Sequence, residues 1–390
     1  MFIHCCIQKT EIMLKTEKEI VFSFNGADTS YLTHSLHPFP AKFPPQLPKK
    51  ILEDYAIKGQ TVLDPFCGSG TTLVEARIFG VNSIGVDVNG LSVLLSQVKA
   101  TPLSEKQFSI IENFIANIED LTFKCKFNGR PKFSIKKIEG QDHWFQQNVS
   151  EEITFLLTNI AQLNDVMVQN FLKIVLSSII VRVSNQESDT RFAAIQKNIP
   201  NYFTLEQFIK RTKEYNLRMK EFSELVQNST ELQVFNADSR NLDFISDNSI
   251  DIIITSPPYA NTYDYYLYHK FRKRWLDLDV KFAQYNEIGS RREYSSLKEK
   301  KEKWNEDLIK CFKEMQRVLK PSHFAFIVIG DSVIKKELIK IEKEISNFTP
   351  DIGFKVNDIL SSDLSNHSKI FNPSYAQKGK KEHLIILEKI

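Results

Sequence analysis

The segment Ile250-Asp251-Ile252-Ile253-Ile254-Thr255-Ser256-Pro257-Pro258-Tyr259 joins an apolar, β-branched run to two consecutive prolines. The apolar run predicts a strand that is buried on both faces, as strands of parallel sheets are. The prolines have fixed φ angles and no backbone N–H, so they end the strand and stiffen the following loop. An alternative interpretation is an ordinary strand that ends at a proline-rich turn with a tyrosine in the core.

The loop after this strand carries groups that suit a flat heterocycle. Ser256 has a hydroxyl, Pro257 has a carbonyl that no strand ladder uses, and Tyr259 has an aromatic ring. The ring can stack on a planar base while the two oxygen atoms accept hydrogen bonds from an exocyclic amino group. Ser256, Pro257, Pro258 and Tyr259 are therefore the candidate catalytic residues.

A second informative segment, Thr61 to Ala76, reads Thr-Val-Leu-Asp-Pro-Phe-Cys-Gly-Ser-Gly-Thr-Thr-Leu-Val-Glu-Ala. It predicts a strand, a glycine turn and a helix, and Asn82 to Asp87 predicts a second strand. Glycines let the backbone approach a ligand, and the helix start offers unpaired N–H groups. Asp87 lies about 20 residues beyond the turn, where nucleotide-binding folds place a carboxylate on ribose hydroxyls. A purely structural role for the turn is the alternative.

Apolar patterns place further elements along the chain. Strands are predicted at 232–238, 324–331, 354–356 and 382–388, and helices at 48–59, 304–319 and 334–346. The long stretch 101–230 predicts helices around 104–121, 150–169, 171–185 and 204–227.

Two segments combine aromatic and basic residues. In 123–137, an Asn-Gly pair between alternating residues predicts a β-hairpin, which either contacts phosphates and bases or is solvated with one apolar face. In 263–276, tyrosines and basic residues either bind nucleic acid or form an amphipathic helix with its aromatics in the core. Arg291 and Arg292 are candidate phosphate contacts, and 185–191 predicts a polar, mobile loop between helices.

Composition narrows the class of protein. The 390 residues carry a formal net charge of only +3, so no global basic field indicates nucleic acid binding. The five cysteines form no CxxC pair, which argues against a zinc site or a disulfide framework and suits a reducing, cytoplasmic compartment. No apolar run approaches the roughly 20 residues that a membrane span needs, and the N-terminus lacks a signal-peptide pattern.

With both motifs placed, the sequence resembles the DNA amino-methyltransferases, which methylate N4 of cytosine or N6 of adenine with S-adenosylmethionine. Asp64 to Thr72 resembles their methionine-binding motif, and Thr255 to Tyr259 resembles their catalytic motif. His37 to Pro44 resembles the loop over the methionyl end of the cofactor, and 85–89 and 236–239 resemble the ribose- and adenine-contacting motifs. The resemblance implies cofactor contacts from Phe39, Pro40, Ala41, Lys42, Phe43, Asp64, Pro65, Phe66, Cys67, Gly68, Ser69, Gly70, Thr71, Asp87, Val88, Asn89, Asp238, Ser239 and Thr255. A solvated loop carboxylate is the alternative for Asp238.

The resemblance implies an α/β fold of the Rossmann-like class I methyltransferase type, with a mostly parallel seven-stranded sheet flanked by helices and a helical insertion. The expected divisions are an N-terminal arm, 1–36; a cofactor-binding half, 37–100; a mainly helical insertion, 101–230; and a catalytic half, 231–390. The insertion falls between the second and third strands, so it is either a target-recognition region or a scaffold.

The expected function is site-specific DNA methylation without a metal. Serine at the first position of the catalytic motif, Ser256, resembles the N4-cytosine branch. Double-stranded DNA is the expected partner, a restriction endonuclease is a candidate partner, and no membrane is expected. Alternatives are N6-adenine methylation, an RNA or tRNA methyltransferase, and a binding protein that retains the fold. The RNA enzymes usually carry an N-terminal RNA-binding domain, for which 1–36 is short, and a nicotinamide-dependent oxidoreductase leaves the proline loop unexplained.

Overall fold

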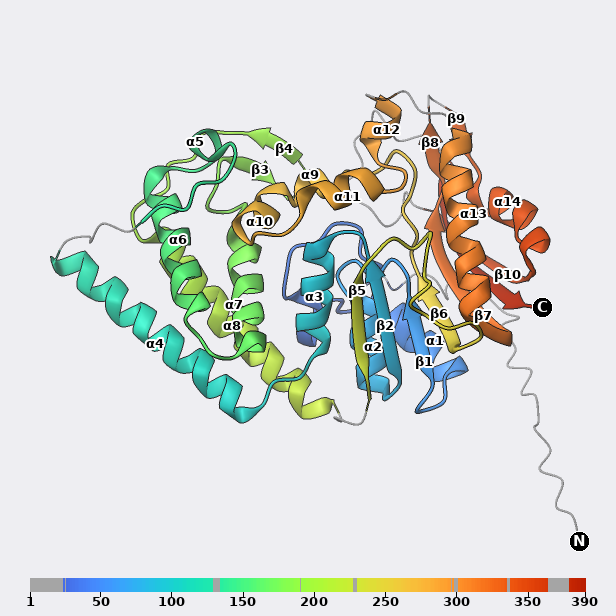
Figure 1. Ribbon diagram of the computed structural model, residues 1–390, viewed down its shortest axis with the longest axis horizontal. Coiled ribbons are helices and arrows are strands. Elements are labelled where there is room, and N and C mark those ends of the chain that lie inside the picture. The colour runs from blue at the N-terminus through green and yellow to red at the C-terminus, as the bar shows by residue number, and fades with distance from the viewer. Residues whose placement is uncertain are drawn as a thin grey trace, which may run out of the picture.

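A seven-stranded sheet with strand order β10-β11-β7-β6-β1-β2-β5 forms the centre of the computed structural model (Figure 1). The strands from β7 to β5 are parallel, and β11 runs antiparallel to both β7 and β10. The strands are β1 Thr61–Asp64, β2 Asn82–Asp87, β5 Leu232–Asn236, β6 Ile250–Thr255, β7 Leu319–Gly330, β10 Phe354–Asp363 and β11 Lys381–Lys389. This topology confirms the predicted Rossmann-like fold. The structure describes residues 24, 26–128, 134–189, 191–226, 230–295, 297, 301–334, 337–363 and 379–390.

Strand β6 is buried along its whole length, as its apolar run predicts. Because successive side chains of a strand point to opposite faces, Ile252 and Ile254 lie in one hydrophobic cluster and Ile253 in another. Ile250, which precedes a register shift against β7, also lies in the second cluster. The first cluster includes residues of α1 Gln46–Tyr55 and α2 Thr71–Phe79, and the second includes residues of α13 Lys301–Val318 and α14 Ile341–Phe348. The sheet is therefore covered on both faces.

A group of helices lies beyond the β5 edge of the sheet (Figure 1). Its helices are α4 Glu105–Asn128, α5 Gln141–Trp144, α6 Gln147–Ala161, α7 Val166–Ile179 and α8 Phe203–Leu225, and α3 Gly90–Ala100 lies between them and the sheet. One hydrophobic cluster runs from Leu95 of α3 through Phe171 and Phe208 to Trp275. The helices therefore share a core with the sheet side of the molecule. Among the described residues, none of the helices is long and apolar enough to span a membrane.

The hairpin prediction for 123–137 is wrong where the structure describes this segment, because α4 continues to Asn128. Phe123 and Phe127 are four positions apart and their rings pack 4.7 Å apart, while Lys124 pairs with Asp120 at 2.6 Å. Such pairs are neighbours on a helix, so the local turn signal loses to helical pairing. Gly129 of the Asn-Gly pair lies outside the described residues, as do residues 130–133.

Other element boundaries also differ from the prediction. The predicted helix 150–169 is two helices, since Asp165 accepts a hydrogen bond from the Val168 N–H at 2.9 Å and starts α7. The predicted loop 185–191 contains β3 Gln186–Ser188 and the start of β4 Arg191–Ala194. The first part of the predicted helix 334–346 instead belongs to the strands β8 Ser332–Ile334 and β9 Glu337–Ile339, and the helix α14 begins at Ile341. The segment 263–276 forms α9 Tyr265–Tyr268 and α10 Lys270–Trp275, followed by α11 Val280–Asn286 and α12 Arg291–Ser295. Most of the predicted N-terminal arm lies outside the described residues.

Candidate functional site

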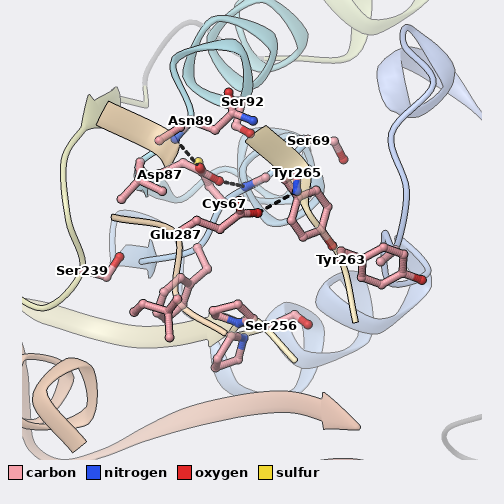
Figure 2. A pocket seen from close by; sticks show the side chains of 18 of the residues that line it. Cys67, Ser69, Asp87, Asn89, Ser92, Ser239, Ser256, Tyr263, Tyr265 and Glu287 are labelled. Atoms are coloured by element: carbon pink, nitrogen blue, oxygen red, sulfur yellow. Dashed lines mark hydrogen bonds between the residues drawn. The ribbon is translucent and has the colours of Figure 1, made fainter. Parts of the chain in front are cut away.

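A cavity that is partly open to solvent lies where β1, β2 and β6 end (Figure 2). Because these strands are parallel, their carboxyl ends meet at one edge of the sheet, where doubly wound folds bind ligands. The cavity brings Gly68 and Asp87 of the nucleotide-binding segment together with Ser256 and Tyr259 of the proline loop. The two motifs are far apart in the sequence and line one cavity.

The glycine turn packs too tightly against α3 for a side chain at Gly70. Gly70 has a φ of +79°, and a Cβ atom there would lie 2.8 Å from the Ser96 Cα atom. The Ser96 hydroxyl donates to the Gly68 carbonyl at 3.0 Å, and the buried Lys99 ammonium donates to the Ser69 carbonyl at 2.7 Å. Helix α2 begins directly after Gly70 without a side-chain cap, so its first N–H groups are available to a ligand.

Asp87 ends β2 and lines the cavity. Its Oδ2 accepts from the Gly68 N–H at 2.9 Å and its Oδ1 from the Asn89 N–H at 2.8 Å. Burial raises the pKa of Asp87 to about 6, although both backbone donors oppose the shift. Each carboxylate oxygen keeps lone pairs for a ligand, as binding of ribose hydroxyls requires.

The proline loop is fixed by residues that are distant in sequence. The Tyr259 hydroxyl donates to Glu382 Oε1 of β11 at 2.8 Å, and the Trp304 indole donates to the Pro258 carbonyl at 3.2 Å. Burial, with the charge of Glu382, raises the pKa of Tyr259 well above its ordinary value, and a hydrogen bond with the Ser256 side chain lowers it. Ser256, Tyr259 and Glu382 therefore form a hydrogen-bonded series at the cavity wall.

Aromatic rings of Phe39, Tyr263 and Tyr265 line another part of the cavity. Phe39 stacks on Tyr265 with ring centroids 5.7 Å apart and on His269 at 5.0 Å, and Tyr263 packs on Tyr265 at 5.4 Å. The aromatics of 263–276 thus divide between the cavity, where Tyr265 lies, and the core, where Trp275 is fully buried. The core interpretation is confirmed for Trp275, and nucleic acid binding by this segment stays a prediction.

Glu287 brings an acidic side chain to the cavity in addition to Asp87 and Asp238. Its Oε1 accepts from the Tyr265 N–H at 2.7 Å and its Oε2 from the Tyr266 N–H at 3.3 Å (Figure 2). Burial raises the pKa of Glu287 to about 8, and the charge of Lys273 opposes that shift. At neutral pH this carboxyl therefore holds its proton in the absence of a ligand.

Most of the predicted site residues line the cavity, and a few lie behind it. The lining residues that the sequence predicts are Phe39, Ala41, Lys42, Phe43, Phe66, Cys67, Gly68, Ser69, Thr71, Asp87, Val88, Asn89, Asp238, Ser239, Ser256, Pro257, Pro258 and Tyr259. Pro40, Asp64, Pro65, Gly70 and Thr255 are not among the lining residues. Asp64 is buried and accepts from the Thr255 hydroxyl at 2.7 Å, which joins β1 to β6 beneath the cavity.

Asp238 is already engaged by a neighbouring cation. The Arg240 guanidinium donates to Asp238 Oδ1 at 3.0 Å and Oδ2 at 2.6 Å and also to Asp307 Oδ1 at 2.9 Å. The Ser239 hydroxyl donates to the Pro65 carbonyl. The ion pair with Arg240 compensates the charge of Asp238, which still lines the cavity. A ligand there would therefore contact an oriented ion pair and not a free carboxylate.

Sequence reasoning missed several lining residues. They are Ser92, Tyr263, Tyr265, Tyr266, Ala283, Asn286, Glu287 and Ile288, and Glu382 behind Tyr259 also escaped notice. The density of tyrosine in 263–268 was a visible signal for three of them. Glu287 and Glu382 carry no local signal, because each is recruited by a tertiary hydrogen bond.

Asp331, Glu342 and His383 bring possible metal-binding atoms within 4.8 Å of one another. Asp331 also accepts from Lys340 Nζ at 2.8 Å and from the Lys381 N–H at 3.0 Å. These donors lower the pKa of Asp331. Because cations and N–H groups already hold both of its oxygens, we interpret the group as an ion-pair network that ties the end of β7 to β11 and α14.

The fold and the cavity define a class I methyltransferase with a nucleotide-type cofactor site. The family model described as DNA methylase, of the N6/N4 type, matches residues 10–93 and 250–387. The chain belongs to this family and is an S-adenosylmethionine-dependent DNA amino-methyltransferase. The unmatched stretch between the two segments contains α4 to α8.

The individual relatives share about a quarter of their residues with this chain. The type II methyltransferase M.MvaI of Kocuria varians is 26% identical over 371 residues, which cover 83% of this chain and 81% of that protein. M.MjaII of Methanocaldococcus jannaschii, another type II methyltransferase, is 25% identical over 393 residues, covering 79% and 73%. Among solved structures, an S-adenosylmethionine-dependent methyltransferase from Methanosarcina mazei aligns over 87% of this chain and 97% of its own, with 12% identity and a TM-score of 0.34.

Proposed function

We propose that this protein methylates N4 of cytosine at a specific sequence in double-stranded DNA. The observation that carries the proposal is the position of Ser256 and Tyr259 in the same cavity as the glycine turn and Asp87. A methyl donor seated on the turn and a base held at the proline loop would share one enclosed space. Serine at the first position of the loop favours cytosine, through the resemblance to the N4 branch.

The cavity residues fit S-adenosylmethionine. Gly68 and Ser69 of the glycine turn line the cavity, and the Gly68 and Asn89 N–H groups orient the two carboxylate oxygens of Asp87. Residues that would hold the cofactor are the turn 66–71, Phe39 to Phe43, Asp87 to Asn89, and Asp238 with Ser239. When bound, the cofactor supplies a methyl group on a sulfonium sulfur, which leaves as a neutral thioether.

The proline loop activates the amino nitrogen of the base. This nitrogen is a weak nucleophile because its lone pair is delocalised into the ring. The Ser256 Oγ and Pro257 carbonyl oxygens accept from the amino group and favour the tetrahedral nitrogen of the transition state. Tyr259 stacks on the base once it has left the duplex, and the nitrogen releases one proton to water after the methyl transfer. No covalent nucleophile is required.

The type II relatives also suggest a biological setting. We propose that the enzyme acts on a defined site within a restriction-modification system in the cytoplasm, with a companion endonuclease. Helices from 101–230 are the proposed contributors to target recognition, because they adjoin the cavity wall through α10. The position of this segment beside the aromatic wall supports the assignment.

The base assignment is tested by expressing the protein in cells that lack other DNA methyltransferases. Their DNA is digested to nucleosides and analysed by mass spectrometry, with a Ser256→Ala, Tyr259→Ala double variant as control. We expect N4-methylcytosine that the control lacks. N6-methyladenine instead would overturn the assignment to cytosine, and purified protein that methylates RNA but not DNA would overturn the assignment to DNA.

A further inference from the structure

We propose that Glu287 is a further carboxylate of the cofactor site, besides Asp87 and Asp238, and accepts hydrogen bonds from donor groups of S-adenosylmethionine. The inference rests on the proposed cofactor role of the cavity. The candidate donor groups are the ribose hydroxyls and the ammonium group of S-adenosylmethionine, and either kind can donate to a carboxylate. Neither the family motifs nor the sequence pattern assigns a role to this residue.

Backbone N–H groups orient the carboxylate of Glu287 in the same way as that of Asp87. In each carboxylate, one backbone N–H donates to each oxygen: Gly68 and Asn89 to Asp87, and Tyr265 and Tyr266 to Glu287. Both side chains line the cavity (Figure 2). Two backbone donors orient such a carboxylate and leave lone pairs on both oxygens. The carboxylate of Glu287 is thus prepared for a ligand on a segment far from Asp87.

A buried amine supports the same arrangement. Lys273 on α10 is fully buried, and within the described part of the chain its ammonium has no hydrogen-bond partner. The charges of Glu287, Asp87 and Asp279 act on Lys273, while Asp264 and Lys273 act on Glu287 from the elements around it. Lys273 therefore favours the ionised form of Glu287, and Asp264 opposes it.

Ligand binding should accordingly release a proton. Burial raises the pKa of Glu287 to about 8, so the carboxyl is protonated at pH 7 before a donor arrives. A ligand donor, hydroxyl or ammonium, prefers the ionised carboxylate, so the complex forms with loss of that proton. Cofactor affinity then rises with pH up to about 8. The release appears in calorimetry as a dependence of the binding enthalpy on the ionisation enthalpy of the buffer.

The alternative is that Glu287 only satisfies the first N–H groups of α9. The chain offers a matched control in Glu152, which is fully buried and accepts from the Tyr202 N–H at 2.7 Å and the Thr204 N–H at 3.0 Å at the start of α8. Glu152 does not line the cavity. A residue that only caps a helix should affect stability and leave ligand affinity unchanged.

The test is isothermal titration calorimetry of the full-length protein with S-adenosylmethionine at pH 7, in phosphate and in Tris. We expect Glu287→Gln to weaken binding about tenfold or more and to reduce proton release, since hydrogen bonds to ionised groups are the strong ones. Glu152→Gln should bind as the wild type does. Titration with 5′-methylthioadenosine, which keeps the ribose and lacks the amino acid, identifies the donor: weaker binding by the variant indicates ribose hydroxyls, and equal binding indicates the ammonium.

Two results would overturn the inference. One is wild-type affinity with unchanged proton release in Glu287→Gln, and the other is an equal loss of affinity in Glu152→Gln. A wild-type protein that fails to bind S-adenosylmethionine at all would instead refute the cofactor site itself. The failure of this inference and the failure of the proposed function are thus distinguishable.

Discussion

The hydroxyl of Tyr259 is held by Glu382, a residue 123 positions further along the chain. A tyrosine whose proton goes to a carboxylate can accept from a neighbouring hydroxyl, and Ser256 is that neighbour. Under the proposed function, Ser256 then keeps its lone pairs for the amino group of a base. At the residue scale, Glu382 is therefore a positioning residue that acts through Tyr259 on Ser256.

Replacing Tyr259 by phenylalanine should separate stacking from positioning. The Tyr259→Phe variant keeps the ring and loses the hydroxyl, so we expect KM for DNA to stay within about twofold. The kcat should fall about 10- to 150-fold, since one hydrogen bond to a charged partner is worth roughly 1.5–3 kcal/mol. Steady-state kinetics measures both constants. A rise in KM with kcat unchanged would contradict the assignment.

Asp64 should make stability depend on pH, although it lies behind the cavity. Burial raises its pKa from the ordinary 3.8 to about 6, so the folded protein binds this proton more tightly than the unfolded chain does. Its contribution to stability therefore falls as the pH rises from about 4 to about 6 and stays low above that. Asp64→Asn removes the titration, and its Oδ1 can still accept from Thr255 and Phe66, which both donate to that atom in the wild type.

The wild type should lose stability between about pH 4 and pH 6, and the Asp64→Asn variant should not. The unfolding free energy of the variant minus that of the wild type should therefore rise by up to about 3 kcal/mol over this range. Urea unfolding at several pH values measures the difference. The exposed substitution Asp351→Asn serves as control and should show no such trend. A constant difference across this range would show that the Asp64 pKa is not raised.

At the element scale, the turn between β1 and α2 depends on a contact that only glycine permits. Gly70→Ala places a Cβ atom against the Ser96 backbone and adds the strain of a φ of +79°. Gly59 has a similar φ of +88° with nothing within 4 Å, so Gly59→Ala carries the strain alone. We expect Gly59→Ala to cost about 1 kcal/mol and Gly70→Ala about 1–3 kcal/mol more, with weaker S-adenosylmethionine binding only in the latter. Chemical unfolding and calorimetry measure the two effects, and equal effects would contradict the close approach.

The sequence predicts elements well where the signal is local. The apolar run of β6, the glycines before α2 and the acid at the end of β2 each carry their own pattern, and all three are confirmed as structural elements. The failures share a different cause. The Asn-Gly signal predicted a hairpin at the end of α4, whereas i,i+4 pairs there favour the helix that the structure has. Glu287 and Glu382 were missed because tertiary hydrogen bonds place them.

At the scale of the whole molecule, α10 connects the cavity wall to the helices beyond β5. Arg272 is fully buried, donates to the Ser177 carbonyl of α7 at 3.0 Å and pairs with Asp189 beside the β3–β4 hairpin. Trp275 of the same helix lies in the hydrophobic cluster of α7 and α8. A segment that contributes Tyr265 to the cavity is thus anchored in the helical part. A movement of the helices beyond β5 should therefore also displace the cavity wall at Tyr265.

This connection predicts that the chain unfolds in one cooperative transition. The tryptophans report on both sides, since Trp144 and Trp275 belong to the helical cluster and Trp304 to the cluster around α13. In a Trp304→Phe variant and in a Trp144→Phe, Trp275→Phe double variant, the fluorescence midpoint should coincide with the circular dichroism midpoint of the same variant. S-adenosylmethionine at about 100 times its Kd should raise both midpoints together by about 3 °C. Two separate midpoints, with only that of Trp304 moved by the cofactor, would show that the helices of 101–230 fold independently of the catalytic sheet.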